Sequence, residues 1–153
     1  MSINAGQPAP EFSLADETGT LRRLADYRGQ TIVLYFYPKD DTPGCTTEAC
    51  NFRDDYSVYE KNGVTILGVS PDNPASHARF KQKFQLPFSL LADTDHALCE
   101  AYGVWGEKQF MGRAYMGALR TTFVIGPDGM IKKVFENVKP ADHSAEVLAA
   151  IKE

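Results

Sequence analysis

Short apolar runs alternate with helix-length segments along this chain, and no other feature constrains its fold as strongly. Three of the runs are continuous and rich in β-branched and aromatic residues, which is typical of strands buried on both faces of a sheet. They span residues 31–37, 64–70 and 121–126. Two further strands are predicted at 88–93 and 130–138. This alternation predicts an α/β fold in which helices pack on a central sheet.

Helical periodicity fills the segments between the strands. The first helix is predicted from Pro43 to Asn62, with apolar residues at steps of three and four along one face. Gly63 is placed to end this helix in the left-handed conformation. Further helices are predicted to begin near Pro74, Asp93 and Asp142.

Turn signals order these elements. Residues 126–129 read Gly-Pro-Asp-Gly, so the last two strands form a hairpin and the sheet is mixed rather than purely parallel. Residues 11–27 read as a small N-terminal hairpin that turns at Gly19, followed by a helical turn. This order is thioredoxin-like, although periodicity alone does not separate it from other three-layer folds. The 153 residues are expected to form one domain, 1–153.

Charge and composition narrow the classes of function. Sixteen basic residues against 20 acidic ones give a net charge of −4, and the basic residues are scattered, which argues against a nucleic-acid partner. No apolar run approaches the ~20 residues needed to cross a bilayer, so no membrane association is expected. The N-terminus does not resemble a signal peptide. Three cysteines, an odd number, favour the reducing cytoplasm.

The best candidate for chemistry is Cys45. Thr42 is a good N-terminal cap and Pro43 suits the first helical position, so Cys45 falls in the first turn of the predicted helix. Free N–H groups and the positive end of the helix dipole favour a thiolate there. Cys45 is therefore a candidate nucleophile at the carboxyl edge of the sheet. The alternative is a small core residue without chemistry.

The other two cysteines carry weaker signals. Cys50 lies five residues after Cys45, about 140° around the helix, and is expected to be partly exposed. It is either a partner of Cys45 or a surface residue of no consequence. Cys99 is expected to be a semi-buried helical cysteine.

Metal and cofactor sites are not expected. The spacing of Cys45 and Cys50 lacks the further cysteines of an iron–sulfur site. The histidines have no zinc-site spacing and are expected on the surface: His77, His96 and His143. No glycine-rich loop for a nucleotide is present.

The segment around Cys45 resembles the active site of peroxiredoxins, specifically the bacterioferritin comigratory protein or Q-type subfamily. The residues that match read YPKDDTPGCTTEAC. The family pattern Pro-x-x-x-Thr-x-x-Cys is met by Pro38, Thr42 and Cys45, and the Q-type second cysteine by Cys50. The family's arginine before a late strand is met by Arg120. Further matching segments extend the resemblance over nearly the whole chain.

The resemblance implies a thiol-dependent peroxidase with a thioredoxin fold. Cys45 would attack hydrogen peroxide or an organic hydroperoxide, become a sulfenic acid and form an intramolecular disulfide with Cys50. Thioredoxin or a similar dithiol protein would reduce that disulfide, and the enzyme would be a monomer. Thr42, Arg120 and backbone N–H groups near Cys45 would supply hydrogen-bond donors in the transition state.

The resemblance gives the remaining site residues supporting roles. Pro38 would close the pocket, and Glu48 would orient an arginine. On their own, Arg120 reads as a solvated strand-edge charge and Glu48 as an ordinary first-turn acid.

Two other functions compete with the peroxidase. A general disulfide oxidoreductase is disfavoured because the chain has no Cys-x-x-Cys. A redox-sensing or chaperone-like binding protein would show no turnover. Peroxide consumption with and without thioredoxin separates all three.

Overall fold

A five-stranded mixed sheet forms the centre of the molecule in the computed structural model, which describes residues 3–151 except for the side chain of Phe110. The strand order is β5-β4-β3-β8-β9. β3, β4 and β5 are parallel, β8 is antiparallel to β3, and β9 is antiparallel to β8, as the predicted closing hairpin requires. The strands span Thr31–Phe36 (β3), Val64–Ser70 (β4), Ser89–Ala92 (β5), Thr121–Ile125 (β8) and Ile131–Phe135 (β9).

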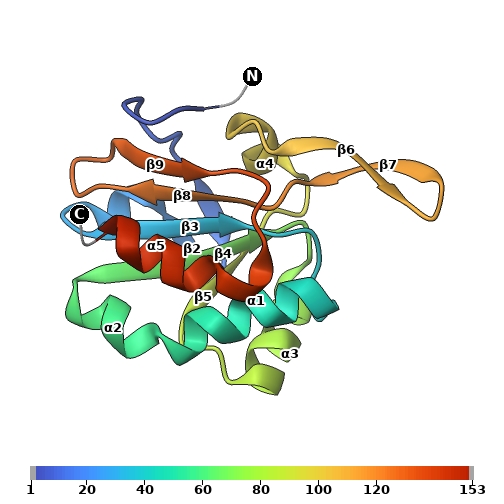
Figure 1. Cartoon of the computed structure of the whole chain (residues 1–153), viewed down its shortest axis with the longest axis horizontal. Helices are drawn as coiled ribbons and strands as arrows, with labels where there is room; N and C mark the ends of the chain where they lie inside the picture. The colour runs from blue at the N-terminus through green and yellow to red at the C-terminus, as the bar shows by residue number, and fades with distance from the viewer. Residues whose placement is uncertain (1–2, 152–153) are drawn as a thin grey trace.

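Helices follow the parallel strands and close the chain. They are α1 (Pro43–Asp54), α2 (Tyr56–Lys61), α3 (Pro74–Phe84), α4 (Ala97–Ala101) and α5 (His143–Ile151), with short 3₁₀ turns at Leu24–Tyr27 (η1) and Pro140–Asp142 (η2). In Figure 1, α1, α2, α3 and α5 gather on one side of the sheet. In the part of the chain that the structure describes, no helix has the length and apolar character to cross a membrane.

The side chains of β3 belong to two core layers, one on each face of the sheet, because successive side chains of a strand point to opposite faces. Ile32, Leu34 and Phe36 pack with the N-terminal segment and α4. Val33 and Tyr35 pack on the other face, against α1, α2, α3 and α5. Since both faces are covered, β3 is a continuous apolar run rather than an alternating one.

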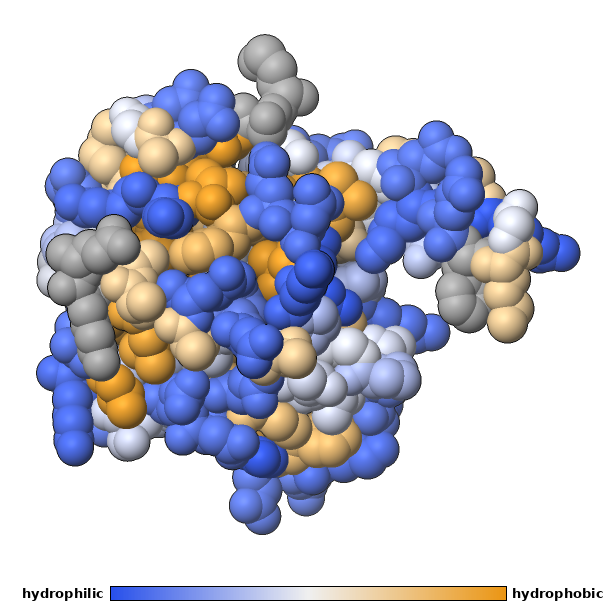
Figure 2. All heavy atoms as spheres, viewed as in Figure 1, coloured by the Kyte–Doolittle hydropathy of each residue, from blue (hydrophilic) through white to orange (hydrophobic). Residues whose placement is uncertain are grey.

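Two small hairpins lie outside the central sheet. The predicted N-terminal hairpin is present as β1 (Ser13–Ala15) and β2 (Leu21–Arg23). A second, unpredicted hairpin is formed by β6 (Trp105–Phe110) and β7 (Arg113–Ala118). It extends away from the body of the molecule (Figures 1 and 2).

The single helix predicted for residues 43–62 is interrupted at Asp55. Its N–H group still bonds to the carbonyl of Asn51, but its φ and ψ of −95° and 5° leave the helical region. The Asp55 carboxylate accepts a hydrogen bond from the Ser144 hydroxyl of α5 at 2.7 Å, so tertiary contact outweighs local periodicity. Gly63 takes a φ of 68°, as predicted for the residue that ends this segment.

The third helix was predicted to begin near Asp93 but begins at Ala97. The buried Asp93 carboxylate accepts hydrogen bonds from the N–H groups of Leu98 and Cys99, at 3.0 and 2.8 Å. Asp93 therefore caps the helix from outside it, as acidic residues do at helix N-termini. The predicted strand 130–138 is also too long, since β9 ends at Phe135.

Candidate active site

Cys45 lies in the first turn of α1, just beyond the carboxyl end of β3. The first hydrogen bond of this turn runs from Thr46 N–H to the Thr42 carbonyl at 2.8 Å, so the N–H groups before it have no partner within the helix. Cys45 is only 1% exposed and packs in the cluster that contains Tyr35 and Phe52. Its sulfur therefore lies at the positive end of the helix, which favours a thiolate.

Arg120 brings a fixed positive charge to this sulfur. It directly precedes β8, which pairs with β3, and so lies beside α1. Its Nη2 donates to Cys45 Sγ at 3.2 Å, and its side chain is only 17% exposed. A Cβ on Gly44 would lie 3.2 Å from the same Nη2, so glycine permits the close approach. Arg120 is thus not the solvated edge charge that its sequence position alone suggests.

Glu48 binds the second terminal nitrogen of the Arg120 guanidinium. Its Oε1 accepts a hydrogen bond from Arg120 Nη1 at 2.8 Å. Burial, opposed by the Arg120 charge, raises the pKa of Glu48 to about 7. The second oxygen, Oε2, has no hydrogen-bond partner among the described residues. Glu48 and Cys45 therefore share one arginine, and the contact expected between Glu48 and an arginine is present.

Thr42 precedes α1, but the prediction that its side chain caps the helix is wrong. No N–H group of the first turn bonds to its hydroxyl. The hydroxyl instead donates to the Lys39 carbonyl at 2.9 Å, because a loop carbonyl competes for it. Since this donation uses its only proton, Thr42 offers an acceptor oxygen to the site, where a donor was expected.

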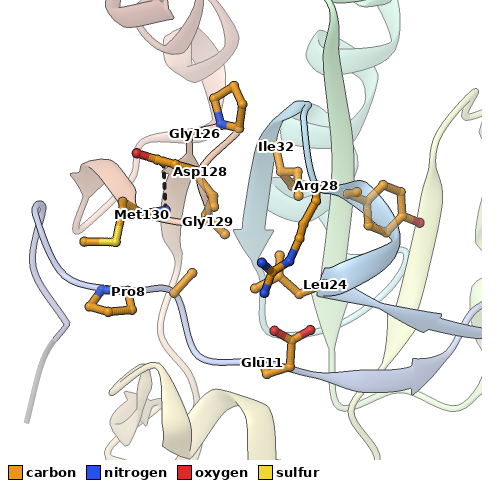
Figure 3. A pocket seen from close by; sticks show the side chains of 13 residues that line it. Pro8, Glu11, Leu24, Arg28, Ile32, Gly126, Asp128, Gly129 and Met130 are labelled. Atoms are coloured by element: carbon orange, nitrogen blue, oxygen red, sulfur yellow. Dashed lines mark hydrogen bonds between the residues drawn. The ribbon is translucent and has the colours of Figure 1, made fainter.

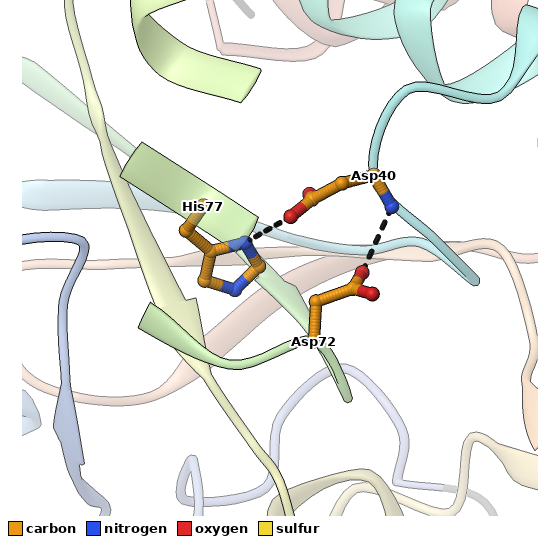
Figure 4. A group of neighbouring side chains, drawn as sticks. All are labelled: Asp40, Asp72 and His77. Atoms are coloured by element: carbon orange, nitrogen blue, oxygen red, sulfur yellow. Dashed lines mark hydrogen bonds and ion pairs between the residues drawn. The ribbon is translucent and has the colours of Figure 1, made fainter. Parts of the chain in front are cut away.

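The loop that carries Thr42 is fixed by a buried network around Asp40 (Figure 4). The Asp40 carboxylate accepts hydrogen bonds from the Tyr37 hydroxyl at 2.6 Å and the Ser76 hydroxyl at 2.8 Å, and its Oδ2 lies 2.7 Å from His77 Nδ1. Asp40 N–H donates to the Asp72 carboxylate at 2.8 Å. The loop is thereby tied to α3 and to the end of β4.

One side-chain oxygen or nitrogen atom from each of Asp40, Asp72 and His77 lies within 4.8 Å of the others, which is close enough for the three residues to bind one metal ion. However, both oxygens of Asp40 already contact protein groups, and so do both ring nitrogens of His77, whose Nε2 donates to the Leu91 carbonyl at 2.9 Å. Because these groups satisfy one another, the cluster acts as a hydrogen-bond network. It holds the loop of the half-buried Pro38 in place.

The expectation that all three histidines lie on the surface is wrong for His77 and His143, which are both buried. His143 Nε2 lies 2.7 Å from the Thr122 hydroxyl and its Nδ1 lies 2.6 Å from Glu146. Burial lowers the pKa of His143. Only His96 has a substantially exposed side chain. The partners of the buried rings come from distant segments, which sequence spacing does not reveal.

The structure holds all three cysteines as free thiols. Cys50 lies on the same uninterrupted helix as Cys45 and is partly exposed, as expected. Cys99 is 0% exposed, more deeply buried than predicted. Burial raises the pKa of the Cys99 thiol, which favours the neutral form. Cys99 is therefore a core residue.

Comparison with known proteins identifies the family. The sequence pattern of the AhpC/TSA family matches residues 5–134. The chain is 50% identical over 151 residues to the putative peroxiredoxin bcp of Coxiella burnetii, covering 99% of this chain and 100% of that protein. It is 48% identical over 153 residues to peroxiredoxin Bcp of Bacillus subtilis, covering 100% and 98%. This chain belongs to the peroxiredoxins.

Solved structures place this peroxiredoxin in the predicted subfamily and confirm its thioredoxin-like fold. The structure matches that of a mutant of PrxQ from Xylella fastidiosa with a TM-score of 0.93 and 37% identity, covering 99% of this chain and 97% of that chain. It matches the bacterioferritin comigratory protein of Xanthomonas campestris with a TM-score of 0.90 and 39% identity, covering 97% and 98%. This peroxiredoxin is accordingly a thiol-dependent peroxidase.

One hollow of this peroxiredoxin lies away from Cys45, at the opposite end of β3. It has a volume of about 240 Å³ and lies between the N-terminal segment at Pro8 and the turn at 126–130 (Figure 3). The residues that line it include Glu11 and Arg28 but no cysteine. This hollow is therefore not part of the site around Cys45.

Sequence reasoning missed three residues around the site. Lys108 lies on β6, and its Nζ donates to the Ala118 carbonyl at 3.1 Å, two residues before Arg120. Asn51 of α1 donates to the carbonyl of Pro140, whose ring also approaches Gly44. Gly112, a turn signal between two extended segments, is the feature that would have predicted the β6–β7 hairpin.

Proposed function

We propose that this peroxiredoxin reduces hydrogen peroxide and organic hydroperoxides with Cys45 as the attacking thiolate. The observation that carries this proposal is the 3.2 Å contact of Arg120 Nη2 with Cys45 Sγ at the start of α1. A guanidinium and a helix N-terminus both favour the ionised sulfur, and the thiolate is the nucleophilic form.

The proposed chemical step transfers one oxygen to sulfur. The Cys45 thiolate attacks one peroxide oxygen and the O–O bond breaks. The other oxygen leaves with the bonding electron pair and takes up a proton to become water or an alcohol. Charge spreads over both oxygens in the transition state, so preorganised donors lower its energy. Arg120 and the N–H groups of Gly44 and Cys45 supply these donors. The Thr42 oxygen accepts a hydrogen bond from the peroxide O–H, and Pro38 limits access of water.

Cys50 is the proposed resolving cysteine. In an intact helix, residues five apart have Cα atoms about 8.6 Å apart, whereas a disulfide needs them within about 7 Å. The first turns of α1 therefore unwind before the Cys50 sulfur attacks the Cys45 sulfenic acid and releases water. Gly44, Thr46 and Thr47 are poor helix formers and make this unwinding less costly.

We further propose that thioredoxin or a similar dithiol protein reduces the Cys45–Cys50 disulfide by thiol–disulfide exchange. The enzyme is proposed to work as a monomeric single domain in the cytoplasm. Sedimentation of the reduced and oxidised chain tests the oligomeric state, and omission of thioredoxin from a peroxide-consumption assay tests the reductant.

The decisive experiment replaces the attacking sulfur. Cys45→Ser should abolish peroxide consumption with thioredoxin present, while Cys99→Ser, a matched loss of a buried thiol, should keep it. If Cys45→Ser retains more than a trace of activity, the assignment is wrong. Peroxide reduction without a dithiol requirement would instead contradict the recycling step.

A further inference from the structure

Glu48 carries a buried carboxyl group that has a partner for only one of its two oxygens. The residue is 1% exposed, and its Oε1 accepts a hydrogen bond from Arg120 Nη1 at 2.8 Å. Its Oε2 is buried as well and has no hydrogen-bond partner among the described residues. Burying a charge without full pairing costs far more than burying a neutral polar group. The surroundings of Glu48 therefore favour its neutral form.

The single positive charge of Arg120 is divided between two acids. Its other terminal nitrogen, Nη2, donates to Cys45 Sγ at 3.2 Å, and Cys45 is also only 1% exposed. If Cys45 and Glu48 were both ionised, these three side chains would carry one excess negative charge in a buried site. When two acids share such a site, the ionisation of one makes the other keep its proton. The geometry therefore couples the protonation of Glu48 to the state of Cys45.

The pKa of Glu48 agrees with this geometry. Burial raises that pKa to about 7, although the charge and the hydrogen bond of Arg120 oppose the rise. A thiolate at Cys45 adds a like charge and competes for Arg120, so it raises the pKa of Glu48 further. Conversion of Cys45 to a neutral sulfenic acid removes that additional effect. Glu48 thus holds a proton more tightly before the oxidation of Cys45 than after it.

The other titratable groups around the pair do not share Arg120 in this way. Tyr35 of β3 is fully buried, and burial holds its pKa well above the usual range, so it stays neutral. Burial lowers the pKa of His143 on α5, whose ring nitrogens lie beside Thr122 and Glu146. Burial also lowers the pKa of Lys108 on β6, whose Nζ donates to the Ala118 carbonyl. Among the described residues, only Glu48 and Cys45 accept hydrogen bonds from the Arg120 side chain.

We propose that Glu48 and Cys45 share one proton across Arg120, so that Glu48 is a neutral carboxylic acid while Cys45 is a thiolate and releases its proton when Cys45 is oxidised. The Cys45 sulfur bonds to one peroxide oxygen and becomes a neutral sulfenic acid. The other oxygen leaves with the electron pair of the O–O bond, and the Glu48 proton converts it to water or an alcohol. Glu48 remains as a carboxylate paired with Arg120. This inference rests on the proposed role of Cys45 as the attacking thiolate.

The first test counts protons in a chain whose only thiol is Cys45, with Cys50→Ser and Cys99→Ser present throughout. The chain is mixed with an equimolar amount of hydrogen peroxide in dilute buffer that contains a pH-indicator dye. At about pH 8, above the pKa of about 7 that Glu48 has beside a neutral Cys45, the parent should take up less than about half a proton per sulfenic acid. Glu48→Gln should take up about one proton from solvent, because glutamine has none to give.

The second test observes the carboxyl group directly and needs no change at Glu48. Infrared difference spectra of the single-thiol chain are recorded before and after oxidation, with and without ¹³C-labelled glutamate. The carbonyl band of a protonated carboxyl group should be present before oxidation and replaced by carboxylate bands afterwards. The isotope shift assigns the band to a glutamate, and its loss in Glu48→Gln assigns it to Glu48. The labelled parent alone decides the matter if Glu48→Gln does not fold.

Glu60→Gln is the matched control, because Glu60 is an exposed glutamate of α2. It should give the same proton count as the parent. Uptake of about one proton by the parent, or equal counts in the parent and Glu48→Gln, overturns the inference. So does the lack of a protonated-glutamate band before oxidation. Mass spectrometry of the same samples reports the state of Cys45, and a Cys45 that stays unmodified would contradict the proposed function instead.

Discussion

Asn51→Ala should accelerate the step in which Cys50 reaches the oxidised Cys45. Asn51 follows Cys50 on α1, and its Nδ2 donates to the carbonyls of Pro140 and Ala141 at 3.1 and 2.6 Å. η2 is thus hydrogen-bonded to α1 beside Cys50, which moves in the proposed resolving step. Removing the amide releases these hydrogen bonds without touching either sulfur.

The magnitude follows from the two hydrogen bonds. Each contributes about 0.5–1.5 kcal/mol, so together they hold α1 with about 2 kcal/mol. Alanine is a better helix former than asparagine by about 0.6 kcal/mol, which offsets part of the loss. The net change of about 1.4 kcal/mol makes local opening of α1 about tenfold more favourable.

Stopped-flow emission of Trp105, the only tryptophan, provides the assay. The first phase depends on peroxide concentration, reports sulfenic acid formation and should be unchanged in Asn51→Ala. The second phase does not depend on peroxide, reports disulfide formation and should be about tenfold faster. Mass spectrometry should show less sulfinic acid at high peroxide, because the sulfenic acid is consumed sooner.

Asn62→Ala is the matched control. Its Nδ2 donates to the Val58 carbonyl at 2.8 Å, so the variant loses a hydrogen bond in α2, away from both cysteines. It should leave the second phase unchanged. If Asn51→Ala speeds that phase no more than Asn62→Ala does, the contacts of η2 do not limit the unwinding of α1.

Three further outcomes are expected. Arg120→Met should react with peroxide on the order of a hundredfold more slowly, as for loss of one transition-state donor. Its melting temperature should stay within a few degrees of that of the parent, because Glu48 can take up a proton once the arginine is lost. A collapsed melting temperature would indicate a structural role instead. Cys99→Ser should keep full turnover, and a loss with Cys50 intact would show that the wrong resolving cysteine was chosen. The pKa of Glu48 is raised to about 7 in the folded protein, so the folded state binds this proton more tightly than the unfolded state. The stability gained in this way is complete at pH values below the pKa of an ordinary glutamate and is lost as the pH rises through about 7. Melting temperatures should therefore favour Glu48→Gln over the parent increasingly between about pH 5 and about pH 7, and a constant difference would contradict the pKa shift.

Sequence patterns were most informative where local chemistry and burial agree. The runs at 31–37 and 64–70 predict β3 and β4 to within a residue because both faces of these strands are buried. The first-turn position of Cys45 follows from Pro43 and the end of β3. These features depend on residues near one another in the chain, so a linear pattern records them.

Features made by distant segments were not predictable in the same way. The helix predicted through residue 62 breaks at Asp55 because a serine of α5 binds its carboxylate. The Thr42 side chain does not cap α1, because its hydroxyl donates to the Lys39 carbonyl instead. His77 is buried because Asp40 and Leu91 provide partners for its ring. Each outcome depends on a contact that exists only after the chain has folded.

The pairing of Cys45 with Arg120 spans 75 residues of sequence. A chain emerging from the ribosome exposes the cysteine long before the strand that follows the arginine can dock beside β3. Domains generally complete such long-range pairings only once the last strands are available. The nascent cysteine therefore has neither its guanidinium nor its buried helix. By the role proposed for Cys45, its reactivity toward peroxide depends on completion of the sheet, so a truncated or unfolded copy should consume little peroxide.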